Sequence, residues 1–264
     1  MARHVVILAN AEAVACEAAE RILRLVEVAK LAKRAFHLVL SGGSTPKRLY
    51  EILAKSNMSW DHVHFFWGDE RCVGPDHRDS NYKMTYDTLL SKINPSPSHI
   101  HRLQGEIDPA LSAQDYEKAI RHVFGLTLDD PAIPSFDLVL LGMGADGHTA
   151  SLFPETQALK ETTKWVVANF VPKLEGTRLT LTPIILNRAA RIFFLIAGED
   201  KANTLKVVLE GPYNPVHLPS QLIHSDTGKV RWLIDTAASG CLAFSPLQGE
   251  GQAAQKHVPH GTYP

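Results

Sequence analysis

Cysteine is scarce in this chain, with three residues, Cys16, Cys72 and Cys241, among 264. Their number is odd and none forms a CxxC pair, so we expect neither a disulfide framework nor a zinc knuckle. An excess of one charge is also missing, because 27 Lys and Arg nearly balance 28 Asp and Glu, for a formal net charge of −1. The balance argues against a nucleic-acid partner, although a few local cations would suffice for a small anion.

Long hydrophobic runs are missing as well. The opening MARHVVILAN is too short in apolar residues for a signal peptide or a membrane span, so we expect a cytosolic protein with no membrane partner. No internal repeat or Pro/Gly-rich linker divides the chain. We therefore predict a single domain over residues 1–238, followed by a mobile tail over 239–264, where apolar periodicity is lost.

Short apolar runs alternate with longer amphipathic stretches. The runs are rich in Val, Ile, Leu and Phe without clean alternation, which is typical of strands covered on both faces. The alternation predicts a three-layer α/β/α fold with a mostly parallel, doubly wound sheet. The expected strands are His4–Leu8, Phe36–Leu40, Val63–Trp67, Phe136–Leu141, Trp165–Val171, Arg191–Ala197 and Val230–Ile234, and the expected helices are Glu12–Ala35, Pro46–Lys55, Asn81–Lys92, Ser112–Phe124 and Lys201–Leu209.

Ligands bind beyond the carboxyl ends of the strands in such a sheet, and three expected strand ends carry unusual polar residues. The first reads Ser41-Gly42-Gly43-Ser44-Thr45-Pro46. Two glycines let backbone amides approach a ligand, and the start of a helix favours an anion. We expect Pro46 at the first helical position, with Ser44 or Thr45 as its cap. The pattern indicates either a phosphate-binding turn or simply a well-capped helix.

The second strand end is Trp67-Gly68-Asp69-Glu70-Arg71, which leads through a charged loop to Ser80, an expected helix cap. Asp69 and Arg71 are two residues apart, so they face the same way if the chain stays extended. The other acids of this region are interpreted as a solvated salt-bridge loop: Glu70, Asp76 and Asp79.

The third is Gly142-Met143-Gly144-Ala145-Asp146-Gly147-His148. It contains GxGxxG after a strand, but it lies in the middle of the chain and lacks the acidic strand end of a dinucleotide site. We expect the turn to place His148 at the start of a helix, whose positive end would favour the neutral imidazole that a general base needs. A structural histidine is the alternative.

Two weaker candidates involve other side chains. His62 with His64, and His99 with His101, could chelate a metal, but neither pair has a third ligand nearby, so we expect no metal site. Cys72 follows a cation yet lacks a base partner, which disfavours a nucleophilic thiolate.

The segments SGGSTP, WGDERCVGPDHRDSNY and LGMGADGHTASLFP, in this order and spacing, resemble the glucosamine-6-phosphate isomerase/6-phosphogluconolactonase family. RLTLT from Arg178 and GEDKA around Lys201 are similar to its later motifs, and the resemblance covers residues 1 to about 238. It implies an α/β/α fold and hydrolysis of 6-phosphogluconolactone to 6-phosphogluconate in the pentose phosphate pathway. No metal or organic cofactor is implied.

The resemblance also implies roles for individual residues. His148 would be the base, with Asp146 and Asp69 lining the site, and Arg71, Arg178 and Lys201 would recognise the substrate. For the mechanism, we expect the phosphate to bind the backbone amides of Gly42, Gly43, Ser44 and Thr45. Arg178 and Lys201 would hold it together with these amides.

Three other functions stay open at this point. The family's deaminases share the Asp-Gly-His core, but have an acid before the proline where this chain has Phe153. A sensor of sugar phosphates on the same fold would need an output module, and no helix-turn-helix or basic region is visible. A nicotinamide-dependent dehydrogenase is the third, and a dinucleotide titration would test it.

Overall fold

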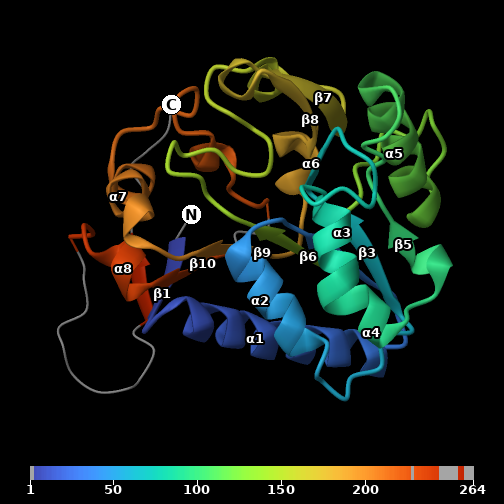
Figure 1. The fold of residues 1–264 in the computed structure, drawn as a ribbon, viewed down its shortest axis with the longest axis horizontal. Coiled ribbons are helices and arrows are strands. Elements are labelled where there is room, and N and C mark those ends of the chain that lie inside the picture. The colour runs from blue at the N-terminus through green and yellow to red at the C-terminus, as the bar shows by residue number, and fades with distance from the viewer. Residues whose placement is uncertain (1–2, 227–228, 244–254, 259–264) are drawn as a thin grey trace.

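The computed structural model describes residues 3–226, 229–243 and 255–258. An eight-stranded sheet in the order β11-β1-β10-β9-β6-β2-β3-β5 runs through the molecule (Figure 1). All neighbouring strands from β1 to β5 in this order are parallel, and β11 joins the β1 edge antiparallel. The strands are β1 (Arg3–Leu8), β2 (Phe36–Leu40), β3 (Val63–Trp67), β5 (Ile100–His101), β6 (Leu138–Leu141), β9 (Ile192–Ile196), β10 (Val230–Asp235) and β11 (Gln255–Val258). The predicted mostly parallel α/β sheet is confirmed.

A second, three-stranded antiparallel sheet is built from β4 (Asp69–Arg71), β8 (Gly176–Leu181) and β7 (Val166–Val171), in that order. It was not predicted as a separate sheet. The apolar run 165–171 does form a strand, but one that pairs with β8 instead of entering the main sheet. Because β4 follows β3 after a single residue, this second sheet begins where the main sheet ends.

Helices cover both sides of the main sheet. Figure 1 shows α1 and α2 along one side, with α5 and the β7–β8 hairpin on the other. Asn10 caps α1, which packs Val14, Ala18, Ile22 and Val26 inward. The helices are α1 (Ala11–Leu31), α2 (Ser44–Leu53), α3 (Asn81–Thr85), a π-helical turn (Tyr86–Leu90), α4 (Ser91–Ile93), α5 (Pro109–Val123), α6 (Pro183–Leu186), α7 (Ala202–Glu210) and α8 (Thr236–Ser239). Within the described residues, none of these helices is long and apolar enough to cross a membrane.

The C-terminal segment carries one described element. β11 lies inside the segment predicted to be a mobile tail, and its backbone pairs with β1, from Arg3 opposite Val258 to Val6 opposite Gln255. Residues 244–254 and 259–264 lie outside the described part of the chain. The domain boundary at residue 238 stays a prediction.

Candidate active site

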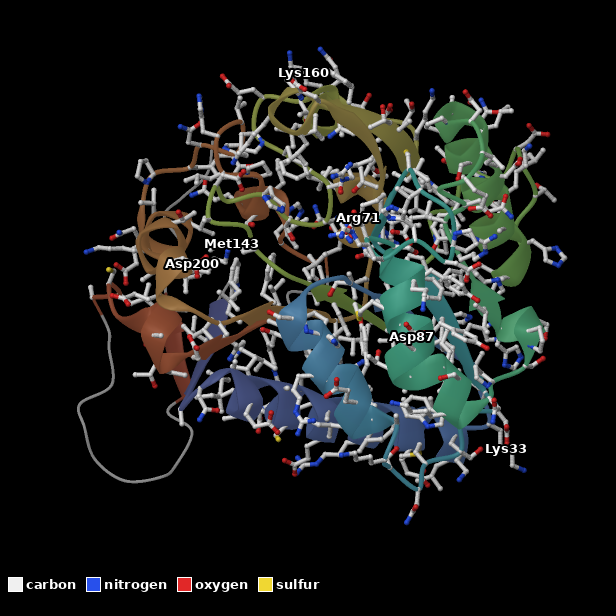
Figure 2. The ribbon with its side chains drawn as sticks, viewed as in Figure 1. Lys33, Arg71, Asp87, Met143, Lys160 and Asp200 are labelled. Carbon is white, nitrogen blue, oxygen red and sulfur yellow. The ribbon has the colours of Figure 1, made fainter. Side chains whose placement is uncertain are left out.

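The three polar strand ends meet around one cavity of about 310 Å³ at the carboxyl edge of the main sheet. Such an edge is where ligands bind in doubly wound folds. Figure 2 labels Arg71 and Met143, two of the lining side chains, in the interior of the view. The lining comprises Ser41 to Pro46 after β2, Asp69 and Arg71 on β4, Asn81 on α3, Gly142 to Gly144 with His148 and Ala150 after β6, Leu195 to Ala197 on and after β9, and Lys201.

The turn after β2 begins α2 two residues earlier than expected. Ser44 is the first residue of the helix, and Gly43 occupies the cap position with φ of 110°, a conformation that favours glycine. The expectation that Pro46 starts the helix is therefore wrong. Gly42 is restricted for another reason, since a Cβ there would lie 2.0 Å from Oδ1 of Asn81. The backbone amides at this helix start therefore lie in the wall of the cavity.

A buried tyrosine fixes the strand end that leads into this turn. The Tyr50 hydroxyl donates to the Ser41 carbonyl at 2.8 Å and accepts from the Ser41 amide at 2.9 Å. Tyr116 holds Trp67 at the end of β3 in the same way, at 3.1 and 2.7 Å. Burial raises the pKa of both phenols, so they stay neutral and can donate. The backbone is therefore held by hydrogen bonds where the loops after β2 and β3 begin.

On β4, Asp69 and Arg71 both line the cavity, as expected for residues two apart in an extended chain. The Ser151 hydroxyl donates to Oδ2 of Asp69 at 2.7 Å, and the side-chain amide of Asn81 donates to Oδ1 of Asp69 at 3.3 Å. The Arg71 guanidinium donates to the Asp79 carbonyl. Asp69 is therefore oriented by two neutral donors that the sequence analysis did not single out.

Glu70 lies between Asp69 and Arg71 on β4. The sequence was interpreted as placing it in a solvated salt-bridge loop, and that interpretation is wrong. Its side chain is buried and accepts hydrogen bonds from the amides of Asn81 and Tyr82 at 2.7 and 2.8 Å, and from the Ser80 hydroxyl at 3.0 Å. Burial raises the pKa of Glu70, while the amide donors oppose that rise. The carboxylate thus joins β4 to the start of α3.

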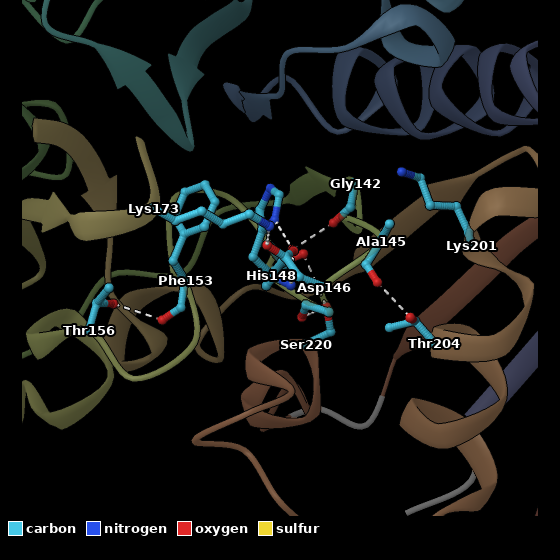
Figure 3. A network of polar contacts seen from close by, with 12 residues as sticks. Gly142, Ala145, Asp146, His148, Phe153, Thr156, Lys173, Lys201, Thr204 and Ser220 are labelled. Atoms are coloured by element: carbon cyan, nitrogen blue, oxygen red, sulfur yellow. Dashed lines mark hydrogen bonds and ion pairs between the residues drawn. The ribbon is translucent and has the colours of Figure 1, made fainter. Parts of the chain in front are cut away.

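His148 forms a hydrogen-bonded chain with Asp146 and Lys173 (Figure 3). Nδ1 of His148 lies 2.5 Å from Oδ1 of Asp146, and Nζ of Lys173 lies 2.8 Å from Oδ2. These two hydrogen bonds, with that from His148 first, hold the pKa of Asp146 well below its usual range. An ionised Asp146 that accepts from Nδ1–H leaves Nε2 as the basic nitrogen of a neutral imidazole.

The helix expected to start at His148 is not formed. Residues 142–154 make turns, with a bridge between Thr149 and Leu152, so the imidazole contacts the Asp146 carboxylate rather than a helix end. The glycines allow this turn to close. Gly147 has a φ of 79°, and a Cβ on Gly144 would lie 2.1 Å from Nδ1 of His148.

Phe153 covers one face of the imidazole, with ring centroids 4.1 Å apart and 21° between the planes. The phenyl ring is buried, with 8% of its residue surface exposed, whereas 29% of the His148 side chain is exposed. Ser220 fastens the same turn through hydrogen bonds from its amide and hydroxyl to the Gly147 carbonyl, both at 2.9 Å. Phe153 thus packs against one face of the His148 ring, while His148 also lines the cavity.

The two cations expected to hold phosphate lie at different places. Lys201 lines the main cavity just before α7, and its Nζ pairs with Asp200 at 2.8 Å. Arg178 on β8 lies opposite Arg71 on β4 and lines a neighbouring cavity that also includes Arg71. Arg71 therefore separates the two cavities.

The weaker candidates of the sequence contribute nothing to this cavity. Within the described residues, no group of three or more His, Cys, Asp and Glu side chains is arranged to hold a metal ion. Burial raises the pKa of Cys72, which disfavours its thiolate, and all three cysteines are free.

Known proteins share both sequence and fold with this chain. The model of the family "Glucosamine-6-phosphate isomerases/6-phosphogluconolactonase" matches residues 9–232. A 6-phosphogluconolactonase of a Nostoc species is 36% identical over 92% of this chain and 100% of its own length. The crystal structure of 6-phosphogluconolactonase from Leishmania guyanensis matches with a TM-score of 0.79, at 31% identity, over 92% of this chain and 100% of that one. A monomeric glucosamine-6-phosphate deaminase, at 21% identity and a TM-score of 0.75 over 90% of this chain and 99% of its own, shares the fold. This chain therefore belongs to the glucosamine-6-phosphate isomerase/6-phosphogluconolactonase family.

Proposed function

We propose that the protein is a 6-phosphogluconolactonase, which hydrolyses 6-phospho-D-glucono-1,5-lactone to 6-phosphogluconate in the oxidative pentose phosphate pathway. The observation that carries the proposal is His148 in the same cavity as the turn after β2 and Lys201, with Asp146 hydrogen-bonded to His148 from outside the lining, where the sequence had placed it in the lining. A base and an anion site, held a short distance apart, are what a phosphorylated ester requires for hydrolysis by water.

The phosphate binds at the start of α2. Backbone amides of Gly42, Gly43, Ser44 and Thr45 face an anion there, and the helix dipole favours its charge. Lys201 supplies a cation on the other side of the cavity. Arg178 assists from beside Arg71, across the paired strands β4 and β8. Binding energy from the phosphate then positions the lactone carbonyl for attack.

His148 acts as the general base. Its Nε2 removes a proton from water as the oxygen attacks the lactone carbonyl carbon, and Asp146 stabilises the imidazolium that forms. The Arg71 guanidinium in the cavity wall stabilises the developing oxyanion, and the Asp69 carboxylate on the same strand accepts hydrogen bonds from the ring hydroxyls. When the tetrahedral intermediate collapses, the ring C–O bond breaks and the imidazolium returns its proton to the leaving ring oxygen.

Deamination of glucosamine 6-phosphate is the main rival activity, and Phe153 argues against it. Departure of an amine needs a proton donor close to the sugar ring, and a buried phenyl group against the catalytic imidazole supplies none. The cavity, at about 310 Å³, has the size of a small-molecule site, so the substrate is a small molecule.

We place the enzyme in the cytosol, because its three cysteines are free thiols.

Acid release from freshly prepared 6-phosphogluconolactone tests the proposal, with ammonia release from glucosamine 6-phosphate measured in parallel. The protein should accelerate acid release well beyond the spontaneous rate and release no ammonia. His148→Gln serves as the background control in both assays. Acid release at the spontaneous rate, or stoichiometric ammonia, would reject the assignment.

A further inference from the structure

A second cavity, of about 430 Å³, lies at the amino ends of β1, β10 and β9, at the opposite edge of the main sheet from the candidate active site. The C-terminal half of α1 covers it. His4, Arg231 and Phe193 form one lateral row across the three strands, because His4 pairs with Arg231 and Arg231 with Phe193. We call this the basic cavity, for the five Arg and Lys side chains that line it: Arg21, Arg24, Arg191, Lys229 and Arg231.

Their charges are only partly balanced. On α1, Arg21 pairs with Glu17 and Arg24 with Glu20, one helical turn away. Within the part of the chain that the structure describes, Arg191, Lys229 and Arg231 form no ion pair, and the residues lining the cavity include no acid. Three cations without an ion pair among the described residues, in one concave surface, repel one another and attract an anion of matching charge.

The lining of the basic cavity also has an apolar part. It comprises Phe193, which is buried, and Leu25 and Val28 of α1. Val28 is 59% exposed, which is high for a valine beside a cavity. Small-molecule sites combine such apolar walls with a few convergent polar groups, and this volume falls in their usual range. Arginine in particular binds phosphate through two parallel hydrogen bonds.

We propose that the basic cavity binds a small organic phosphate with two or more negative charges and an apolar or aromatic portion, the chemistry of a nucleotide. The phosphates contact Arg191, Lys229 and Arg231, and the apolar portion lies against Phe193, Leu25 and Val28. Inorganic polyphosphate shares the charge but lacks the apolar portion, so the two sources can be distinguished by affinity.

This site is separate from the candidate active site, although one strand links them. Phe193 of β9 lines the basic cavity, while Leu195 and Ile196 of the same strand line the cavity that holds His148. Ligands at the two ends of β9 therefore do not contact each other. Binding at the basic cavity should not compete with 6-phosphogluconate.

Calorimetric titration of the full chain with ATP tests the proposal, with saturating 6-phosphogluconate present to block the active site. ATP should bind with one site, more tightly than tripolyphosphate or adenosine, and more weakly as salt is raised. No ATP binding, or equal affinity for tripolyphosphate, would overturn the proposal. Displacement of ATP by 6-phosphogluconate would also overturn it, since that places the nucleotide in the active site.

Charge-neutral variants locate the site. Arg231→Gln and the exposed Lys229→Gln should each weaken ATP binding on the order of tenfold, as expected when a charge-assisted contact to phosphate is lost. Lys160→Gln is the matched control. Lys160 lies at the outer edge of the molecule (Figure 2), and its substitution changes the net charge by the same amount as the other two. All three should keep the thermal midpoint and lactone hydrolysis. Equal weakening by Lys160→Gln, or none by the other two, would show that the basic cavity is not where ATP binds.

Discussion

Phe153 lies against the imidazole of His148, with the two ring centroids 4.1 Å apart and 21° between the ring planes. The contact fixes the plane of the imidazole, while the hydrogen bond to Asp146 fixes its rotation within that plane. Phe153 and Asp146 together therefore fix the orientation of the proposed base.

Phe153→Glu should lower kcat for lactone hydrolysis more than tenfold without producing ammonia from glucosamine 6-phosphate. The new carboxylate would be buried beside the imidazole, where it would favour the protonated base and disturb the stack. Phe153→Leu is the control for loss of the ring alone and should have the smaller effect. Measurable deaminase activity in the Glu variant would show that this position alone selects the reaction.

His148→Gln should lower kcat by about 10²- to 10⁴-fold, the usual contribution of a general base, with little change in KM. Its amide cannot accept a proton from water. Steady-state kinetics with the unfolding midpoint as a control for folding would check this. Near-normal turnover by the folded variant would remove His148 from the mechanism.

Gly144→Ala should also lower kcat strongly, because the added Cβ would lie 2.1 Å from Nδ1 of His148 and 2.7 Å from Oδ1 of Asp146. The pair would have to separate. Gly142→Ala is a matched control in the same loop, since an added Cβ there meets no atom within 4 Å. Kinetics of the two variants should therefore differ widely, and similar values would mean that the His148–Asp146 pair is not needed in its present geometry.

Lys201→Gln and Arg178→Gln should weaken inhibition by 6-phosphogluconate while sparing weak inhibition by unphosphorylated gluconate. The effect of Lys201 should be the larger, because it lines the main cavity and Arg178 lies beyond Arg71. Inhibition constants for both ligands decide the matter. Equal losses for the two ligands would assign these cations to the sugar or to the fold.

Mild acid should destabilise the protein through His64 and His101. Their rings hydrogen-bond at 3.0 Å, with His99 and His37 beside them, and burial first of all lowers the pKa of each to about 4. An unfolded histidine binds a proton near pH 6.5, so the unfolded state gains protons first and stability falls between about pH 6.5 and 4. His101→Gln should flatten this dependence in denaturant titrations at pH 7.5 and 5. An unchanged slope would contradict the prediction.

The sequence predicted the fold well because the elements of the main sheet carry local signals. Uninterrupted apolar runs mark strands such as β2 and β9, whose positions agree with expectation to within a residue or two. The short β4 carries no such signal, since its residues are Asp-Glu-Arg and its pairing with β8 joins segments about a hundred residues apart. Tertiary pairing of this kind overrides local propensity.

The sequence predicted those site residues that lie together in a short motif. It did not predict those that come from distant parts of the chain. Asp146 was predicted because it lies two residues before His148 in the same motif. The contacts made by Lys173, Ser151 and Ser220 were not predicted, because these residues are far in the sequence from the groups that they contact. The burial of Glu70 was missed because a charged loop predicts solvation unless backbone amides converge on one carboxylate.

The hydrogen bonds of Glu70 have a consequence for how the loop after β4 can vary. They close a ring between β4 and α3, so that Asp69 and Asn81 are joined through Glu70 as well as through the loop that contains residues 73–77. The entropy cost of closing a loop grows only slowly with its length. We therefore expect an insertion between Gly74 and Pro75 to leave the cavity wall in place, which makes this loop a site at which a label or a sensor domain could be attached.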